Sequence, residues 1–161
     1  MTLSRALLLA SLLGPAAVLG AALFSQYVGG LAPCPMCIWQ RWPHAIAIAL
    51  AALALLLVPR PASRLVAKAA LGAGALALLV GAGIGVFHAG VELGYWEGPS
   101  TCVGGDISTL STEALIAQIQ GAPLVRCDEI AWSFAGVSMA GWNAILSLGL
   151  AALTALAARR L

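Results

Sequence analysis

Charged residues are scarce in this chain, and their scarcity limits what it can be. Eight basic and six acidic side chains make up 9% of the 161 residues, whereas 61% are hydrophobic and the mean hydropathy is +0.99. A soluble domain of this length cannot bury so much apolar surface. The formal net charge of +2 gives no basis for nucleic-acid binding. The sequence also lacks internal repeats and linkers, so nothing in it indicates a second domain.

Long apolar runs take the place of the missing charge. A helix needs about 20 apolar residues to cross the hydrocarbon core. Four stretches qualify, at residues 6–28, 38–58, 65–87 and 137–158. Because they fill more than half of the chain, the sequence predicts an all-α integral membrane protein with one domain, a four-transmembrane-helix bundle over residues 1–161. The first run also resembles a secretory signal peptide, but its length favours a retained span.

Glycine is dense in the third predicted span. Gly81 and Gly85 form a G-x-x-x-G motif there. A phosphate-binding loop would need a preceding strand, which the sequence does not offer. The motif therefore predicts close packing against neighbouring helices.

The few basic residues are unevenly placed. Only Arg41 and Arg126 lie on the side of the two longer connections, at about 29–37 and 89–136. The other six flank the termini and the short 59–63 loop, namely Arg5, Arg60, Arg64, Lys68, Arg159 and Arg160. Positive residues concentrate on the cytoplasmic side of membrane proteins. The sequence therefore predicts cytoplasmic termini and two outward-facing loops.

All four cysteines fall in or beside these outward loops. Cys34 and Cys37 form a C-x-x-C pair in the first, and Cys102 and Cys127 lie in the second. Cysteines confined to the outer side indicate an oxidising compartment, the periplasm of a Gram-negative-type cell. A C-x-x-C pair that closes and reopens carries two electrons, so we expect redox chemistry at the membrane surface.

The second loop contains a helix signal of its own. Ser111, Thr112 and Glu113 are typical of a helix start, and Gly121 ends the pattern. An apolar side at 114–119 predicts a short amphipathic helix along the membrane surface. The alternative is a loop helix packed on the bundle.

Arg41 follows Cys37 by one helical turn. We expect Cys37 near a helix N-terminus, where backbone N–H groups and the Arg41 charge would favour its thiolate form. The same guanidinium could bond a carbonyl oxygen of a bound ring. The alternative for Arg41 is an interfacial anchor. His88, at the outer end of the third span, is either a ligand-binding or proton-carrying group or an ordinary interfacial histidine.

Several other readings of the cysteines are disfavoured. Ile38 stands where a c-type haem motif needs histidine. A four-cysteine zinc site is a poor match because Cys102 and Cys127 are too far apart to form a paired knuckle. Two inert structural disulfides remain an alternative, although a Cys34–Cys37 bridge closes too small a loop to stabilise the fold much.

The order of these motifs resembles the disulfide bond formation protein B (DsbB) family of bacterial inner-membrane thiol oxidases. The resemblance covers essentially the whole chain. Besides the four spans, it is carried by the following segments: Cys34 to Pro43, His88 to Glu92, Cys102, Arg126 to Asp128, and Trp132 to Asn143.

The resemblance implies a redox relay. A DsbA-like periplasmic oxidase of the thioredoxin fold would reduce a Cys102–Cys127 disulfide, with Cys102 forming the mixed disulfide, and exchange would pass the electrons to Cys34 and Cys37. The Cys37 thiolate would then reduce a membrane quinone, expected to be ubiquinone with menaquinone as the alternative. Arg41 and His88 would bind this quinone.

Two rival functions stay open at this point. The vitamin K epoxide reductase-like family also couples loop thiols to quinones, but its C-x-x-C follows the loop cysteine pair and here it precedes it. A non-catalytic membrane subunit stapled by two disulfides would bind no quinone. A relative that serves one dedicated oxidase is a narrower version of the same function.

Overall fold

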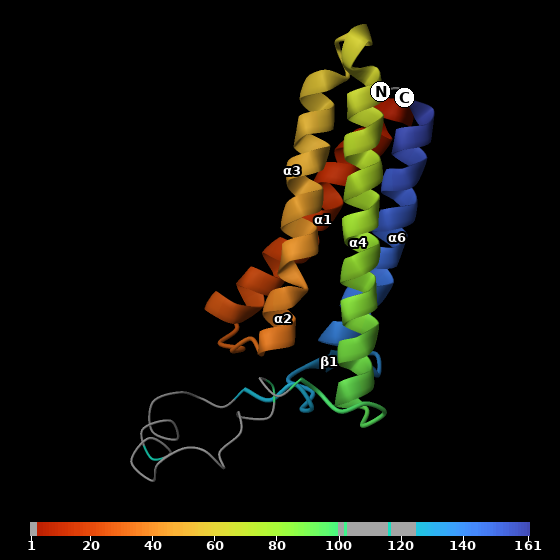
Figure 1. Cartoon of the computed structure of the whole chain (residues 1–161). Coiled ribbons are helices and arrows are strands. Elements are labelled where there is room, and N and C mark those ends of the chain that lie inside the picture. The colour runs from red at the N-terminus through yellow and green to blue at the C-terminus, as the bar shows by residue number, and fades with distance from the viewer. Residues whose placement is uncertain (1–2, 100–101, 103–115, 117–124) are drawn as a thin grey trace.

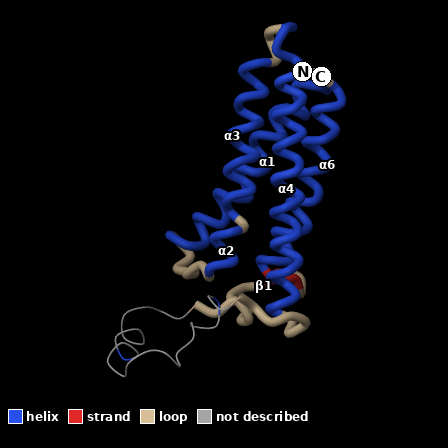
Figure 2. The backbone as a smooth tube through the Cα atoms, in the orientation of Figure 1, coloured by secondary structure: helices blue, strands red, loops and turns tan. Residues whose placement is uncertain are grey.

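The structure, a computed structural model, describes residues 3–99, 102, 116 and 125–161. In chain order its elements are α1 (Leu3–Tyr27), α2 (Pro35–Trp39), α3 (Arg41–Leu57), the 3-10 turn η1 (Pro61–Ser63), α4 (Arg64–Glu92), β1 (Ser133–Phe134), β2 (Val137–Ser138) and α6 (Met139–Arg160). The long helices lie alongside one another in an elongated bundle (Figures 1 and 2). The predicted helical membrane fold is therefore confirmed.

Among the described residues, four helical segments are long and apolar enough to cross a membrane. α1, α4 and α6 each contribute one, and α2 with α3 forms the other, Pro35–Leu57. The third segment extends beyond its predicted end at residue 87, because α4 continues to Glu92. His88 therefore lies within a helix that continues for another turn. The amphipathic helix predicted near 111–119 lies outside the described residues, apart from Ile116.

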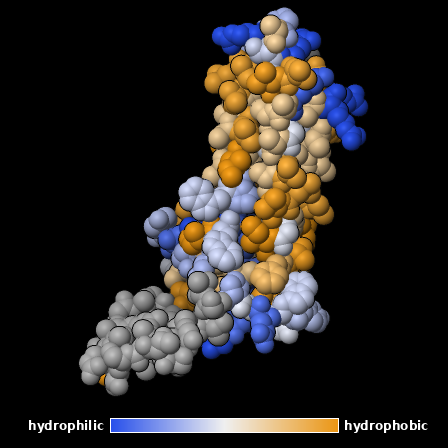
Figure 3. Space-filling model, in the orientation of Figure 1, coloured by the Kyte–Doolittle hydropathy of each residue, from blue (hydrophilic) through white to orange (hydrophobic). Residues whose placement is uncertain are grey.

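The two ends of the bundle carry the polar groups. Both termini lie side by side at the end that also holds η1 (Figure 1), where the Ser4 hydroxyl donates to the backbone oxygen of Arg160 at 3.5 Å. The C-x-x-C segment lies at the opposite end, where Cys34 caps α2 and Cys37 falls within it (Figure 1). Apolar side chains cover the flanks of the helices between these ends, and hydrophilic residues gather at both ends (Figure 3).

Glycines let α4 approach its neighbours closely. A Cβ atom at Gly85 would lie 3.0 Å from the backbone oxygen of Ala140 and 3.0 Å from the backbone nitrogen of Ala144, both on α6. One at Gly81 would lie 3.0 Å from the Cβ of Pro43 on α3. These separations are too short for ordinary contacts, so the predicted role of the G-x-x-x-G motif is confirmed. They bring α3, α4 and α6 close enough for their polar side chains to meet.

A small hairpin leads into α6. β1 and β2 pair antiparallel, with Ser133 opposite Ser138 and Phe134 opposite Val137. The turn between them needs positive φ, which Gly136 adopts at 77° without steric cost. Ser138 then caps α6, since its hydroxyl oxygen accepts the backbone N–H of Gly141 at 3.2 Å. The hairpin therefore fixes where α6 begins.

Candidate active site

Cys34 is the N-cap of α2. Its backbone is extended, with φ −73° and ψ 166°, and Pro35 is the first helical residue. Proline is favoured at this position and disfavours helical geometry in the residue before it. The Cys34 sulfur accepts the backbone N–H of Cys37 at 3.2 Å. Sequence and cap geometry therefore agree that the chain turns into the helix at Cys34.

The two sulfurs of the C-x-x-C pair are free thiols that contact each other. Cys34 Sγ and Cys37 Sγ are 3.0 Å apart. The hydrogen bond from the Cys37 thiol is the main reason that the pKa of Cys34 falls to about 4, with His88 adding to it and burial opposing it. We predicted that the helix N-terminus would favour the thiolate of Cys37. The structure corrects this, because Cys34 occupies the cap and receives the N–H bond.

Cys102 and Cys127 form the disulfide that the family resemblance implied. Their Cα atoms are 5.3 Å apart, and 25 positions separate them in the chain. Both are buried, with exposed fractions of 4% and 0%. They pack with Cys34, Met36 and Val91 in one apolar cluster. The fold thus places the disulfide directly against the C-x-x-C segment.

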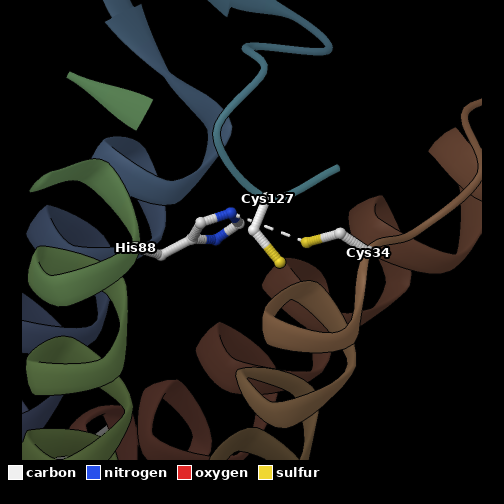
Figure 4. Close-up of side chains that lie close together, drawn as sticks. All are labelled: Cys34, His88 and Cys127. Atoms are coloured by element: carbon white, nitrogen blue, oxygen red, sulfur yellow. Dashed lines mark hydrogen bonds between the residues drawn. The ribbon is translucent and has the colours of Figure 1, made fainter. Parts of the chain in front are cut away.

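Three side chains from separate parts of the chain converge there (Figure 4). The sulfurs of Cys34 and Cys127 and a ring nitrogen of His88 all lie within 4.8 Å of one another. Since the Cys127 sulfur is bonded to Cys102, it is not a free thiolate ligand for a metal in this state. The arrangement instead places a free thiol next to a disulfide, as thiol–disulfide exchange requires.

His88 faces this sulfur cluster from α4. Its Nε2 is 3.6 Å from Cys34 Sγ and 3.9 Å from a carboxylate oxygen of Glu92. Its Nδ1 lies 2.8 Å from the side-chain nitrogen of Gln40. The imidazole is only 3% exposed, and its neighbours are redox and hydrogen-bonding groups. This environment is not that of an ordinary interfacial histidine.

Arg41 points toward α1. Its Nη1 donates to the side-chain oxygen of Gln26 at 2.6 Å, while its buried Nε has no hydrogen-bond partner among the described residues. A buried donor without a partner is costly. The guanidinium is therefore anchored on one side and has a donor available for another acceptor.

A cavity of about 450 Å³ joins these groups. Its polar lining includes Cys34, Cys37, Gln40, Arg41, His88, Glu92 and Asn143. Its apolar lining includes Val18, Leu19 and Phe24 from α1 and Met139, Trp142 and Leu146 from α6. A mostly apolar cavity with a few polar groups in its lining is typical of a small-molecule site.

Three polar residues of this site were not singled out from the sequence. Gln26, Gln40 and Asn143 are uncharged and stand within or beside apolar runs. Polar side chains at membrane depth are themselves a signal, because they need partners there. That signal marks the residues, but it does not reveal which side chains they meet.

This fold and site define a class: a multi-pass helical membrane protein that holds a free dithiol beside a disulfide at one end of its bundle. A family model described as "Disulfide bond formation protein DsbB" matches residues 4–157. The chain belongs to this family, and it is therefore a disulfide-forming membrane protein. The family match also decides against the vitamin K epoxide reductase-like alternative.

Curated relatives agree over nearly the full chain. A disulfide bond formation protein B from Azoarcus sp. (strain BH72) is 36% identical over 155 residues, covering 94% of this chain and 90% of the relative. One from Xanthomonas oryzae pv. oryzae (strain MAFF 311018) is 35% identical over 150 residues, covering 91% and 86%. One from Aromatoleum aromaticum is 34% identical over 148 residues, covering 88% and 84%. No solved structure shows significant similarity to the chain.

Proposed function

We propose that this protein is a thiol:quinone oxidoreductase that reoxidises a periplasmic DsbA-like oxidase of the thioredoxin fold. The observation that carries the proposal is the approach of the Cys34 and Cys127 sulfurs to within 4.8 Å. It puts the two cysteine pairs within reach of exchange. The rival function, a subunit stapled by two disulfides, is poorly supported because Cys34 and Cys37 are free.

The first exchange takes electrons from the partner. A thiolate of the reduced partner attacks the sulfur of Cys102, so that a mixed disulfide forms, the Cys102–Cys127 bond breaks and the electron pair goes to Cys127. The partner's second thiolate then displaces Cys102. The partner leaves oxidised, and both loop cysteines are reduced.

The second exchange moves the electrons inward. The Cys127 thiolate attacks Cys34 in an oxidised Cys34–Cys37 pair, and Cys37 leaves with the electron pair. Cys102 then attacks Cys127, releases Cys34 and restores the Cys102–Cys127 disulfide. Two electrons now reside on the C-x-x-C pair. The free thiols and the disulfide of the structure correspond to this stage of the cycle.

The cavity supports a quinone, either ubiquinone or menaquinone, as the final acceptor. Cys37 and Arg41 both line it, and the unpartnered Nε of Arg41 is a donor suited to a carbonyl oxygen. A bound quinone supplies an acceptor for two electrons and two protons. His88 and Glu92 also line this cavity. A DsbA-type oxidase has a potential of about −120 mV, so its electrons need a higher-potential acceptor than glutathione.

We also propose the placement of this relay in the cell. Both termini and η1 lie at the end opposite the C-x-x-C segment (Figure 1), and most basic residues belong to that terminal end. The distribution supports an inner-membrane protein with cytoplasmic termini and periplasmic cysteines. Cysteine-accessibility labelling of intact cells and of inverted vesicles tests this orientation.

The proposed function is tested by an anaerobic mixture of the purified full-length protein, a reduced DsbA-like oxidase and a soluble quinone. We expect partner thiols and quinone absorbance to fall in equal amounts. Cys37→Ser should abolish quinone loss. If wild-type protein consumes no quinone with any of several DsbA-like partners, while its fold is intact, the proposal is wrong.

A further inference from the structure

A chain of hydrogen bonds links α6, α3 and α4 next to the dithiol. Asn143 Nδ2 donates to Gln40 Oε1 at 2.7 Å. Gln40 Nε2 lies 3.2 Å from the backbone oxygen of Met36 and 2.8 Å from His88 Nδ1. His88 Nε2 then faces Cys34 Sγ at 3.6 Å. Gln40, His88 and Cys34 are all buried, so bulk water has little access to these bonds.

The contacts fix the direction of every bond in this chain. The Met36 backbone oxygen can only accept, so the end of the Gln40 amide that touches it must be the NH₂ group. The same NH₂ group faces His88 Nδ1, which must therefore accept. A neutral imidazole that accepts at Nδ1 carries its hydrogen on Nε2. That hydrogen points toward the Cys34 sulfur.

We infer that Gln40 is a positioning residue that holds His88 as the neutral Nε2–H tautomer, a permanent donor to the Cys34 thiolate. Asn143 supports it by donating to the other end of the amide. In this arrangement His88 does not act as the base that receives the Cys34 proton. Protonating Nδ1 would set an N–H against the NH₂ group of Gln40 and break the chain.

The negative neighbours of His88, the Cys34 thiolate and the Glu92 carboxylate, would by themselves favour an imidazolium, so the NH₂ group of Gln40 at Nδ1 is the contact that holds the ring neutral. Cys34 faces the Cys37 thiol from α2 and His88 from α4, and the Cys127 sulfur is bonded to Cys102. Glu92 Oε1 is 3.9 Å from His88 Nε2, beyond an ordinary hydrogen bond. The pKa of Cys34 is lowered by the bonds from Cys37 and His88. A donor at Nε2 thus serves the thiolate rather than the carboxylate.

This inference deepens the proposed function and rests on it only for its consequence in turnover. Its direct test needs neither quinone nor partner. The chain has two histidines, His44 and His88, so nitrogen NMR of ¹⁵N-histidine-labelled full-length protein resolves their tautomers. A His88→Asn variant assigns the signals. At neutral pH we expect His88 to be unprotonated at Nδ1 and protonated at Nε2, and a protonated Nδ1 would overturn the inference.

Three variants separate the inference from general repacking. Gln40→Glu replaces the donor with an acceptor and should move the proton to Nδ1. Asn143→Asp puts an acceptor where Asn143 donates, so the Gln40 amide should turn round and the proton on His88 should again move to Nδ1. Ser147→Ala is the matched control, because Ser147 lies one turn along α6 from Asn143 and contacts His44 Nε2 at 3.4 Å. Its His88 signals should stay unchanged, and an equal shift in this control would refute the assigned chain.

A second readout follows the thiolate. Iodoacetamide is much smaller than glutathione and can reach Cys34 through the cavity that this residue lines. At unchanged access its labelling rate follows the thiolate fraction, and mass spectrometry identifies the modified cysteine. Gln40→Leu removes the donor to Nδ1, so the pH at which labelling falls by half should rise by about one unit if one hydrogen bond to the thiolate is lost. Unchanged labelling in a folded variant would show that His88 does not serve Cys34. If the NMR and labelling results are as expected but the wild-type protein reduces no quinone, the proposed function is wrong and this inference stands.

Discussion

Replacing Arg41 with methionine gives the sharpest test of the proposed quinone site. Methionine keeps an unbranched, largely apolar stem out to the position of Nε but removes the guanidinium and every donor. The structure anchors the guanidinium through one nitrogen on Gln26 at 2.6 Å and leaves the buried Nε without a partner. If that nitrogen bonds a quinone carbonyl, the variant loses one charge-assisted hydrogen bond.

The expected loss is about 2–3 kcal/mol. It corresponds to an increase of roughly 30- to 150-fold in the KM for quinone, or to an equal fall in kcat/KM. Steady-state quinone reduction by purified variants, with a reduced DsbA-like protein as electron donor, measures this. Arg41→Lys keeps the charge but not the fork of donors, so its loss should be smaller.

Gln26→Leu is the matched control for this experiment. It removes the anchor and leaves the guanidinium in place, so we expect a smaller loss than in Arg41→Met. Wild-type kinetics in a folded Arg41→Met protein would refute the role that we give Arg41. They would favour the alternative of an interfacial anchor.

Three further outcomes are expected. Because the pKa of Cys34 is about 4, its thiolate persists above that pH. Iodoacetamide labelling of Cys34 should therefore stay nearly constant from pH 5 to 8 and fall only as the pH drops through about 4. A labelling rate that rises tenfold per pH unit from pH 5 to 8 would contradict this. Cys102→Ser should block oxidation of the partner, yet quinone should still reoxidise chemically reduced Cys34 and Cys37, and failure of that half-reaction would break the proposed order of the relay. Gly85→Ala should lower the Tm and the free energy of unfolding, the latter by about 1–3 kcal/mol, because the added Cβ would meet the α6 backbone at 3.0 Å. Gly83→Ala is the control, since a Cβ there has open space and should not lower the Tm. Equal Tm values for the two variants would argue against tight α4–α6 packing.

The sequence predicts the parts of this protein that depend on composition along one segment. Apolar length alone locates the four spans, and Pro35 disfavours helical geometry at Cys34 without settling it. The end of α4 was placed too early because apolar character fades after Phe87, while the backbone bonds continue to Glu92.

What the sequence does not supply are the contacts between distant segments. Gln40 meets His88 and Asn143, which lie 48 and 103 positions away along the chain. No local pattern encodes such pairs, because they depend on how closely the helices approach at positions such as Gly85. The N-cap role of Cys34 does not follow from apolar length: the predicted span begins at residue 38, whereas α2 begins at Pro35 and its cap is Cys34.

The burial of the sulfurs has a consequence for selectivity. Cys34, Cys102 and Cys127 are all less than 5% exposed, although they lie at the end of the bundle outside the apolar flanks. A small thiol such as glutathione, arriving from solution, would find little sulfur surface to attack. A folded partner can use its own contact surface to open this region and align its thiolate. Under the proposed function, the burial would restrict electron transfer to the partner oxidase, so that the membrane quinone oxidises that partner and not the small thiols in solution.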